Sequence, residues 1–250
     1  MRLESCVNSA PSAIAAQSGG ADRVELCENM LEGGCTPSAG TIRLARERLH
    51  IALFVMIRPR GADFIYDPDE FGIMKNDILT AKKFGADGVV FGILNPDGTI
   101  DRERMALLME LAYPMQVTCH RAFDMTRDPQ EALNVLISLG ISRVLTSGQS
   151  DSALLGAPLI RELINQSQNR IIIMPGHGIK ENNLAEVIAA TGAQEYHLYL
   201  PTQIPTRMEF IRNDVKMGSP DLSEYSLTRI DPNRIRHAKQ ILLKSRTDQS

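Results

Sequence analysis

The chain has 250 residues, with 27 lysines and arginines against 30 aspartates and glutamates, and its formal net charge is −3. Apolar residues make up 43% of it, which excludes an intrinsically disordered protein, because such chains combine few apolar residues with a high net charge. Since no basic excess is available to neutralise phosphates, the composition also argues against a nucleic-acid partner.

The sequence shows no membrane-spanning or targeting pattern. Its longest uninterrupted apolar run, residues 51–57, has seven residues, whereas a membrane-spanning helix needs about 20. Residues 1–6 lack the apolar region of a signal peptide. With 4 cysteines in 250 residues no disulfide scaffold is indicated, so we expect a cytoplasmic protein with reduced thiols.

Short β-type runs recur along the chain at intervals of roughly 20 to 35 residues, the size of a βα unit. Eight such runs occupy residues 3–7, 23–26, 51–57, 88–91, 116–119, 143–145, 171–174 and 195–197. Segments with helical spacing of apolar residues separate them. This alternation predicts a single α/β domain over residues 1–250, a (β/α)8 TIM barrel.

The alternative to a barrel is an open, doubly wound sheet, which would carry G-x-G-x-x-G after its first strand. Residues 6–11 read CVNSAP instead, so the barrel is favoured.

Residues 198–230 have no clear period, and we expect a long irregular loop near the mouth of the barrel. Asp231 and Pro232 are typical of a helix start, which predicts a closing helix over residues 231–244 with a frayed tail.

In a TIM barrel the chemistry lies at the carboxyl ends of the strands. Because side chains alternate along a strand, Glu4 shares a face with Cys6, and Glu25 shares a face with Cys27. The neighbours of Glu25 are apolar and suit the helix-facing side, so we expect both pairs to face the interior. Internal structural charges are the alternative, although buried glutamate is rare unless it is paired.

The third and fifth strands end in further charged residues. Arg58 and Arg60 could pair with the glutamates or clamp an anion, and Arg60 also fits a solvated loop. His120 and Asp124 are candidates for a general acid/base and its orienting carboxylate. The alternative for His120 is a structural histidine.

The loops after the sixth and seventh strands are polar and rich in glycine, which suits an anion held by backbone N–H groups. The residues concerned are Ser147, Gly148, Gly176 and Gly178. Barrel phosphate sites usually combine the loops after strands seven and eight, yet residues 198–201 contain no glycine. The phosphate pattern is therefore only half present.

Four short motifs together resemble one family, the CutC-type copper homeostasis proteins. They are residues 21–27 (ADRVELC), 56–61 (MIRPRG), 120–124 (HRAFD) and 143–148 (RVLTSG). The resemblance covers about residues 2–230. It implies a cytoplasmic TIM barrel, usually a homo-oligomer, linked to copper handling and Cu(I) binding.

The sequence departs from this family pattern in three places. His177 stands where glycine is common, Cys119 stands where phenylalanine is common, and the loop after His197 lacks the usual small residues. These departures put a shared anion site near strands seven and eight in doubt.

Three functions compete. In the first, Cys6 and Cys27 bind Cu(I), a soft ion that prefers thiolates, unless both thiols only fill the interior. In the second, a barrel enzyme acts on a small anionic substrate, a phosphorylated one included, with Glu25 or His120 moving a proton and Arg58 holding the anion. The third is a non-catalytic scaffold.

For the first two functions, the polar strand ends should converge on one pocket. We expect Glu4, Glu25, Arg58, Arg60, His120 and Asp124 to meet there, because unpaired buried charges cost several kcal/mol each. We also expect a carboxylate beside His120 that raises its pKa.

Overall fold

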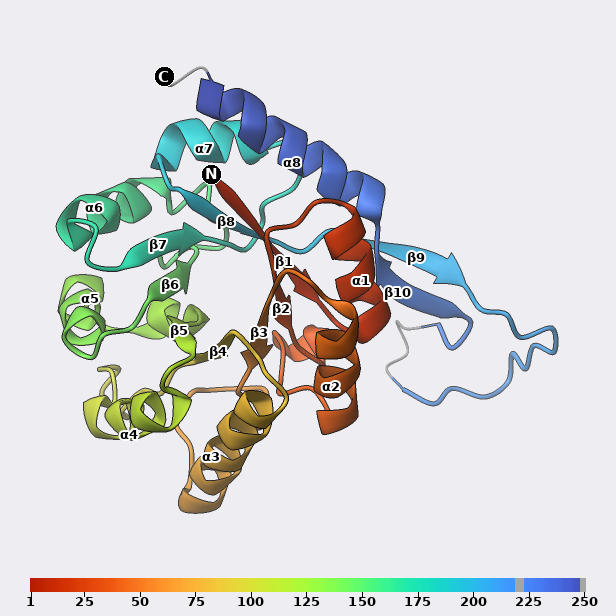
Figure 1. Ribbon diagram of the computed structural model, residues 1–250, viewed down its shortest axis with the longest axis horizontal. Coiled ribbons are helices and arrows are strands. Elements are labelled where there is room, and N and C mark those ends of the chain that lie inside the picture. Colours follow the sequence, from red (N-terminus) through yellow and green to blue (C-terminus); the bar gives the residue numbers. More distant parts are fainter. Residues whose placement is uncertain (219–222, 248–250) are drawn as a thin grey trace.

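The computed structural model describes residues 1–218 and 223–247, and it contains a nearly closed barrel of eight parallel strands surrounded by helices (Figure 1). The barrel strands are β1 (Arg2–Val7), β2 (Arg23–Leu26), β3 (Ala52–Met56), β4 (Gly88–Phe91), β5 (Gln116–Cys119), β6 (Arg143–Thr146), β7 (Ile172–Pro175) and β8 (Glu195–Leu198). Each lies within one residue, at either end, of a run predicted from the sequence. The TIM-barrel prediction is confirmed.

Helices follow the strands on the outside of the barrel (Figure 1). They are α1 (Ala10–Ser18), α2 (Ala39–Arg48), α3 (Pro68–Lys83), α4 (Arg102–Ala112), α5 (Pro129–Ser138), α6 (Ala157–Ser167), α7 (Leu184–Thr191) and α8 (Pro232–Thr247), with the short 3-10 helices η1 (Met30–Glu32) and η2 (Arg121–Met125). The main core lies between strands and helices, where residues such as Leu3, Val24 and Ile42 are fully or almost fully buried. None of the helices among the described residues is long and apolar enough to cross a membrane.

The strands pair in the order β7-β6-β5-β4-β3-β2-β1-β8. The pairing of β1 with β8 sets Glu4 opposite His197, and the pairing of β1 with β2 sets Cys6 opposite Glu25. The first and last strands of the barrel therefore bring residues from both ends of the sequence into one interior layer.

An aromatic ring between two arginines fills the lower part of the barrel interior. The guanidinium carbons of Arg23 and Arg143 lie 4.8 and 4.9 Å from the ring centroid of Phe54. Gly88 on β4 leaves room for this ring, because a Cβ at that position would lie 2.5 Å from it. Charged and aromatic side chains thus fill the lower interior of the barrel.

The prediction for residues 198–230 is wrong in part. The segment contains an antiparallel hairpin of β9 (Pro201–Pro205) and β10 (Ser226–Ile230), which extends away from the barrel beside α1 (Figure 1). Pro201 and Pro205 stand at the two ends of β9, where a missing N–H is tolerated, so the prolines do not exclude a strand. Part of the predicted loop, residues 219–222, lies outside the described residues.

The closing helix after the hairpin is present. It runs over Pro232–Thr247, three residues further than the predicted end at 244. The helix therefore includes the first residues of the predicted frayed tail, and the remaining ones, residues 248–250, lie outside the described residues.

Candidate functional site

A cavity of about 690 Å³ opens at the carboxyl ends of the barrel strands. This volume lies within the range of small-molecule pockets, roughly 300–1,000 Å³. Its lining comprises Cys6, Glu25, Met30, Leu31, Glu32, Gly33, Met56, Arg58, Phe64, His120, Arg121, Asp124, Met125, Leu145, His177, Gly178, Ile179, Lys180, His197 and Tyr199. Four of the six side chains predicted to converge are in this lining, whereas Glu4 and Arg60 are not.

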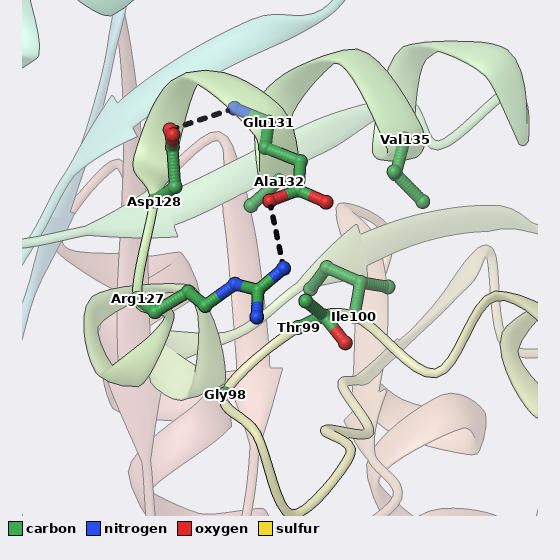
Figure 2. Close-up of a pocket in the computed structure, with 8 residues that line it drawn as sticks. All are labelled: Gly98, Thr99, Ile100, Arg127, Asp128, Glu131, Ala132 and Val135. Atoms are coloured by element: carbon green, nitrogen blue, oxygen red, sulfur yellow. Dashed lines mark hydrogen bonds and ion pairs between the residues drawn. The ribbon is translucent and has the colours of Figure 1, made fainter.

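A smaller pocket of about 140 Å³ lies between residues 98–100 and the start of α5 (Figure 2). Arg127 pairs with Glu131 at 3.5 Å, and the Asp128 carboxylate accepts the backbone N–H of Glu131 at 2.9 Å. These charges satisfy one another, so the mouth of the barrel is the stronger candidate for a functional site.

Cys6 lines the large cavity, and a second cysteine lies directly beside it. Cys6 comes from β1 and Cys27 directly follows β2, and their Sγ atoms are 3.5 Å apart. Both are buried, as expected from the alternation along the two strands. Met30 and Met56 pack in the same cluster, so the immediate surroundings are rich in sulfur.

A histidine from the last strand connects these thiols to two buried glutamates. Glu25 Oε2 lies 3.7 Å from Cys27 Sγ and 3.8 Å from His197 Nε2. On the other side of the ring, His197 Nδ1 donates to Glu4 Oε1 at 2.7 Å. Two sets of three residues each bring their ligand atoms within 4.8 Å of one another. One set is Cys6, Glu25 and Cys27, and the other is Glu4, Glu25 and His197.

The network continues below the cavity through two arginines. Arg23 pairs with Glu4 and, at 2.6 Å, with Glu195, which also accepts from Arg143 Nε at 3.1 Å. Glu4 thus has its partners inside the barrel, and neither Arg58 nor Arg60 pairs with it. Of the two alternatives for these arginines, pairing with Glu4 is therefore not found, because the side chain of Glu4 lies in the layer of Arg23, below the cavity lining.

The pKa values of this cluster are shifted in opposite directions. A hydrogen bond with Cys27 lowers the pKa of the Cys6 thiol to about 6, despite its burial, and His197 adds to the effect. Burial raises the pKa of Glu25 to about 8, against the attraction of His197. Burial also opposes the charge on His197, but Glu25, Cys6 and Glu4 outweigh it and raise the pKa of that ring. The cluster can therefore hold and exchange protons near neutral pH.

His120 does not have the predicted environment. Its Nδ1 accepts the backbone N–H of Ala122 at 3.2 Å, and its ring packs on Phe64 with centroids 5.0 Å apart. Burial and the charge of Arg58 lower its pKa to about 3. The expected carboxylate partner and raised pKa are wrong, because the backbone turns into η2 at His120 and directs Asp124 to another loop.

Asp124 binds the loop after β6. Its carboxylate accepts hydrogen bonds from Ser147 N and Ser147 Oγ, both at 3.0 Å, from Gln149 N at 3.2 Å and from Arg121 Nε at 2.7 Å. The N–H of Ser147, which was predicted to help hold an external anion, thus binds an internal carboxylate.

The glycines of the two loops differ in their roles. Gly148 N–H donates to Thr146 Oγ1, and Gly176 N–H donates to the carbonyl of Thr146. Both donors are therefore already used. Of the four predicted anion-binding loop residues, Gly178 lines the cavity and the other three do not. The neighbouring His177 also lines it.

The two predicted anion-binding arginines differ in position. Arg58 is buried, and its terminal nitrogens donate to the carbonyls of Glu32 and Ala62, each at 2.7 Å. It holds two loops of the cavity wall together. Arg60 pairs with Glu70 at 2.5 Å, away from the cavity.

Comparison with known proteins agrees with the motifs at these strand ends. The sequence profile of the CutC family matches residues 1–201. The chain belongs to the CutC family. It is 48% identical to the copper homeostasis protein cutC homolog of Homo sapiens over 246 residues, which cover 96% of this chain and 90% of that protein.

A bacterial relative and a solved structure extend the comparison. A CutC family protein of Mesorhizobium japonicum is 49% identical over 230 residues, covering 92% of this chain and 89% of that protein. The crystal structure of CutC from Streptococcus agalactiae superposes with a TM-score of 0.76 at 34% identity, covering 79% of this chain and 97% of the other. The resemblance expected from the four motifs is confirmed.

Proposed function

We propose that this CutC-family chain is a cytoplasmic copper homeostasis protein that binds Cu(I) as its cargo between Cys6 and Cys27. The observation that carries the proposal is the 3.5 Å separation of the two Sγ atoms. Two thiolates suffice for a linear Cu(I) site. Since each bond is roughly 2.2 Å long, the sulfurs need to move apart by only about 1 Å.

The surroundings of the thiols support this assignment. A metal ligand must be a thiolate, so its pKa controls binding. With a pKa of about 6, the Cys6 thiol is largely deprotonated at neutral pH. The same hydrogen bond and burial raise the pKa of the Cys27 thiol well above its usual range, so Cys27 loses its proton when Cu(I) binds. Met30 and Met56 pack beside the pair, and their thioethers are also soft ligands.

Anaerobic titration of the purified protein with Cu(I) against a competing chelator tests the proposal. The wild type should bind one Cu(I), and the Cys6→Ser, Cys27→Ser double variant should lose most of that affinity. Cys35→Ser is the matched control, because Cys35 is only half-buried and lies outside the cluster; it should bind like the wild type. Equal affinity in the double variant would reduce the pair to packing.

A second candidate function, an enzyme acting on a small anionic substrate, is favoured by one observation. Glu25 Oε1 is buried at the cavity and has no hydrogen-bond partner among the described residues. With a pKa of about 8, this carboxyl could exchange a proton with a bound molecule. A metabolite that wild type consumes, and Glu25→Gln does not, would establish it. If the wild type consumes no metabolite in such a screen, the enzyme proposal is contradicted and copper binding remains the proposed function.

We propose in addition that the protein is a homo-oligomer. Large apolar side chains are exposed on the segment between β9 and β10, where Phe210 is 68% and Met217 is 82% exposed. Exposed apolar surface of this kind is typical of interfaces. Analytical ultracentrifugation should give a mass of at least two chains, and a monomer at all concentrations would contradict this.

A further inference from the structure

His120 presents a buried donor that none of the described residues satisfies. It is 3% exposed, and because Nδ1 accepts a backbone N–H, the proton of the neutral ring is on Nε2. That Nε2 has no hydrogen-bond partner among the described residues. The Nδ1 edge faces Ala122 and Gly92, so the Nε2 edge faces away from this wall. Buried donors are almost always paired, which indicates that a ligand atom accepts this one.

Near His120, Arg58 carries a positive charge that has no acidic partner among the described residues. Arg58 is 5% exposed and its terminal nitrogens donate to neutral backbone carbonyls. No acidic group among the described residues forms an ion pair with it, whereas Arg23 and Arg143, the other buried arginines of the barrel, both pair with Glu195. Phe64 lies 5.0 Å from the guanidinium and 5.0 Å from the His120 ring, which places the charge and the free donor on one patch.

The rest of the cavity restricts the chemical class of the ligand. Met56, Leu145 and Tyr199 give it apolar walls, and about 690 Å³ is far more than a single metal ion fills. A phosphate would need several donors, yet the N–H groups of residues 147–149 are bound within the protein. A carboxylate needs fewer donors.

We propose that the His120, Arg58 and Phe64 patch binds the carboxylate of a small organic acid. One carboxylate oxygen accepts from His120 Nε2, the negative charge faces Arg58, and the apolar part of the acid packs against the apolar walls. The site is distinct from the thiol pair and requires no copper.

Benzoate and hexanoate, titrated into copper-free protein, test this assignment by saturation-transfer NMR and thermal shift. Both should bind saturably, and benzamide and phenylphosphate should bind at least tenfold more weakly. His120→Asn keeps an acceptor for the Ala122 N–H but removes the Nε2 donor, so it should weaken benzoate binding by about tenfold or more. His120→Gln places an amide N–H near the Nε2 position and should recover part of the affinity.

The control is His177→Asn, which also removes a histidine from the lining but leaves the buried patch intact; it should bind benzoate like the wild type. If His120→Asn does not fold, the ¹⁵N shift of His120 Nε2 in labelled wild-type protein replaces it and should move when benzoate is added. Absence of saturable binding, tighter binding of phenylphosphate, or an unmoved Nε2 signal would overturn the proposal.

Discussion

His197 Nδ1 donates a hydrogen bond to Glu4 Oε1 at 2.7 Å, and this contact joins strand β8 to strand β1 inside the barrel. It connects two parts of the interior. Below it, Glu4 pairs with Arg23. Above it, His197 Nε2 faces Glu25 at 3.8 Å and, through it, the thiols. The ion network that fills the barrel therefore also fixes the histidine beside the candidate copper site.

Replacing Glu4 should destabilise the protein strongly. Glu4→Gln leaves Arg23 without one of its two carboxylates inside the barrel, and breaking a buried ion pair on one side costs about 3–5 kcal/mol. Denaturant unfolding should show a loss of this size. The control is Glu47→Gln on the surface, where the ion pair with Arg43 is 3.9 Å long and exposed, so that the loss should stay below about 0.5 kcal/mol. Equal losses in the two variants would contradict the buried network.

The stability of the wild type should fall in mild acid because of His120. Burial lowers the pKa of His120 to about 3 from an ordinary 6.5, so between these values the unfolded chain binds a proton that the folded chain does not. Stability is then lost as pH falls, by about 2 kcal/mol between pH 6.5 and 5. His120→Asn should show a shallower pH dependence of its unfolding free energy over that interval. Parallel curves for the two proteins would contradict a neutral, buried His120.

Much of the fold was predictable because its signals are local. Each strand is a short β-type run close to a polar or glycine-containing turn, and this pattern located all eight barrel strands to within one residue. The thiol pair was predictable for the same reason, since alternation within β1 and β2 fixes the face of Cys6 and of Cys27. Adjacent parallel strands then bring the two faces together.

The residues that were missed depend on long-range closure. His197 meets Glu4 across 193 residues of sequence, and only the pairing of the last strand with the first brings them together. The signal available was the alternation of Glu195 and His197 on one face of β8. His120 and Asp124 show the opposite case: they are four positions apart, yet η2 turns one toward Ala122 and the other toward Ser147.

Two glycine substitutions should change stability in opposite directions. A Cβ on Gly88 would lie 2.5 Å from the Phe54 ring between the two arginines, so Gly88→Ala should cost about 1–3 kcal/mol by overpacking. A Cβ on Gly72, within α3, would meet nothing within 4 Å, so Gly72→Ala should stabilise by about 0.5–1 kcal/mol. Thermal unfolding of both variants measures this. A stabilising Gly88→Ala would show that the ring does not fill the interior as described.

Removing Asp124 should expose an anion site. Asp124→Ala leaves the N–H groups of Ser147 and Gln149 without their carboxylate, and we expect a loss of about 3 kcal/mol in stability. Formate should raise the melting temperature of the variant and leave the wild type unchanged, with sodium chloride at equal ionic strength as control. The same response in both proteins would show that these donors are not held by Asp124.

X-ray absorption spectroscopy at the copper edge, on protein loaded anaerobically with one Cu(I), tests the central claim most directly. The account predicts two sulfur neighbours at roughly 2.2 Å from copper, and their loss in the Cys6→Ser, Cys27→Ser double variant. A first shell of nitrogen and oxygen only, or an unchanged spectrum in that variant, would contradict copper binding between Cys6 and Cys27.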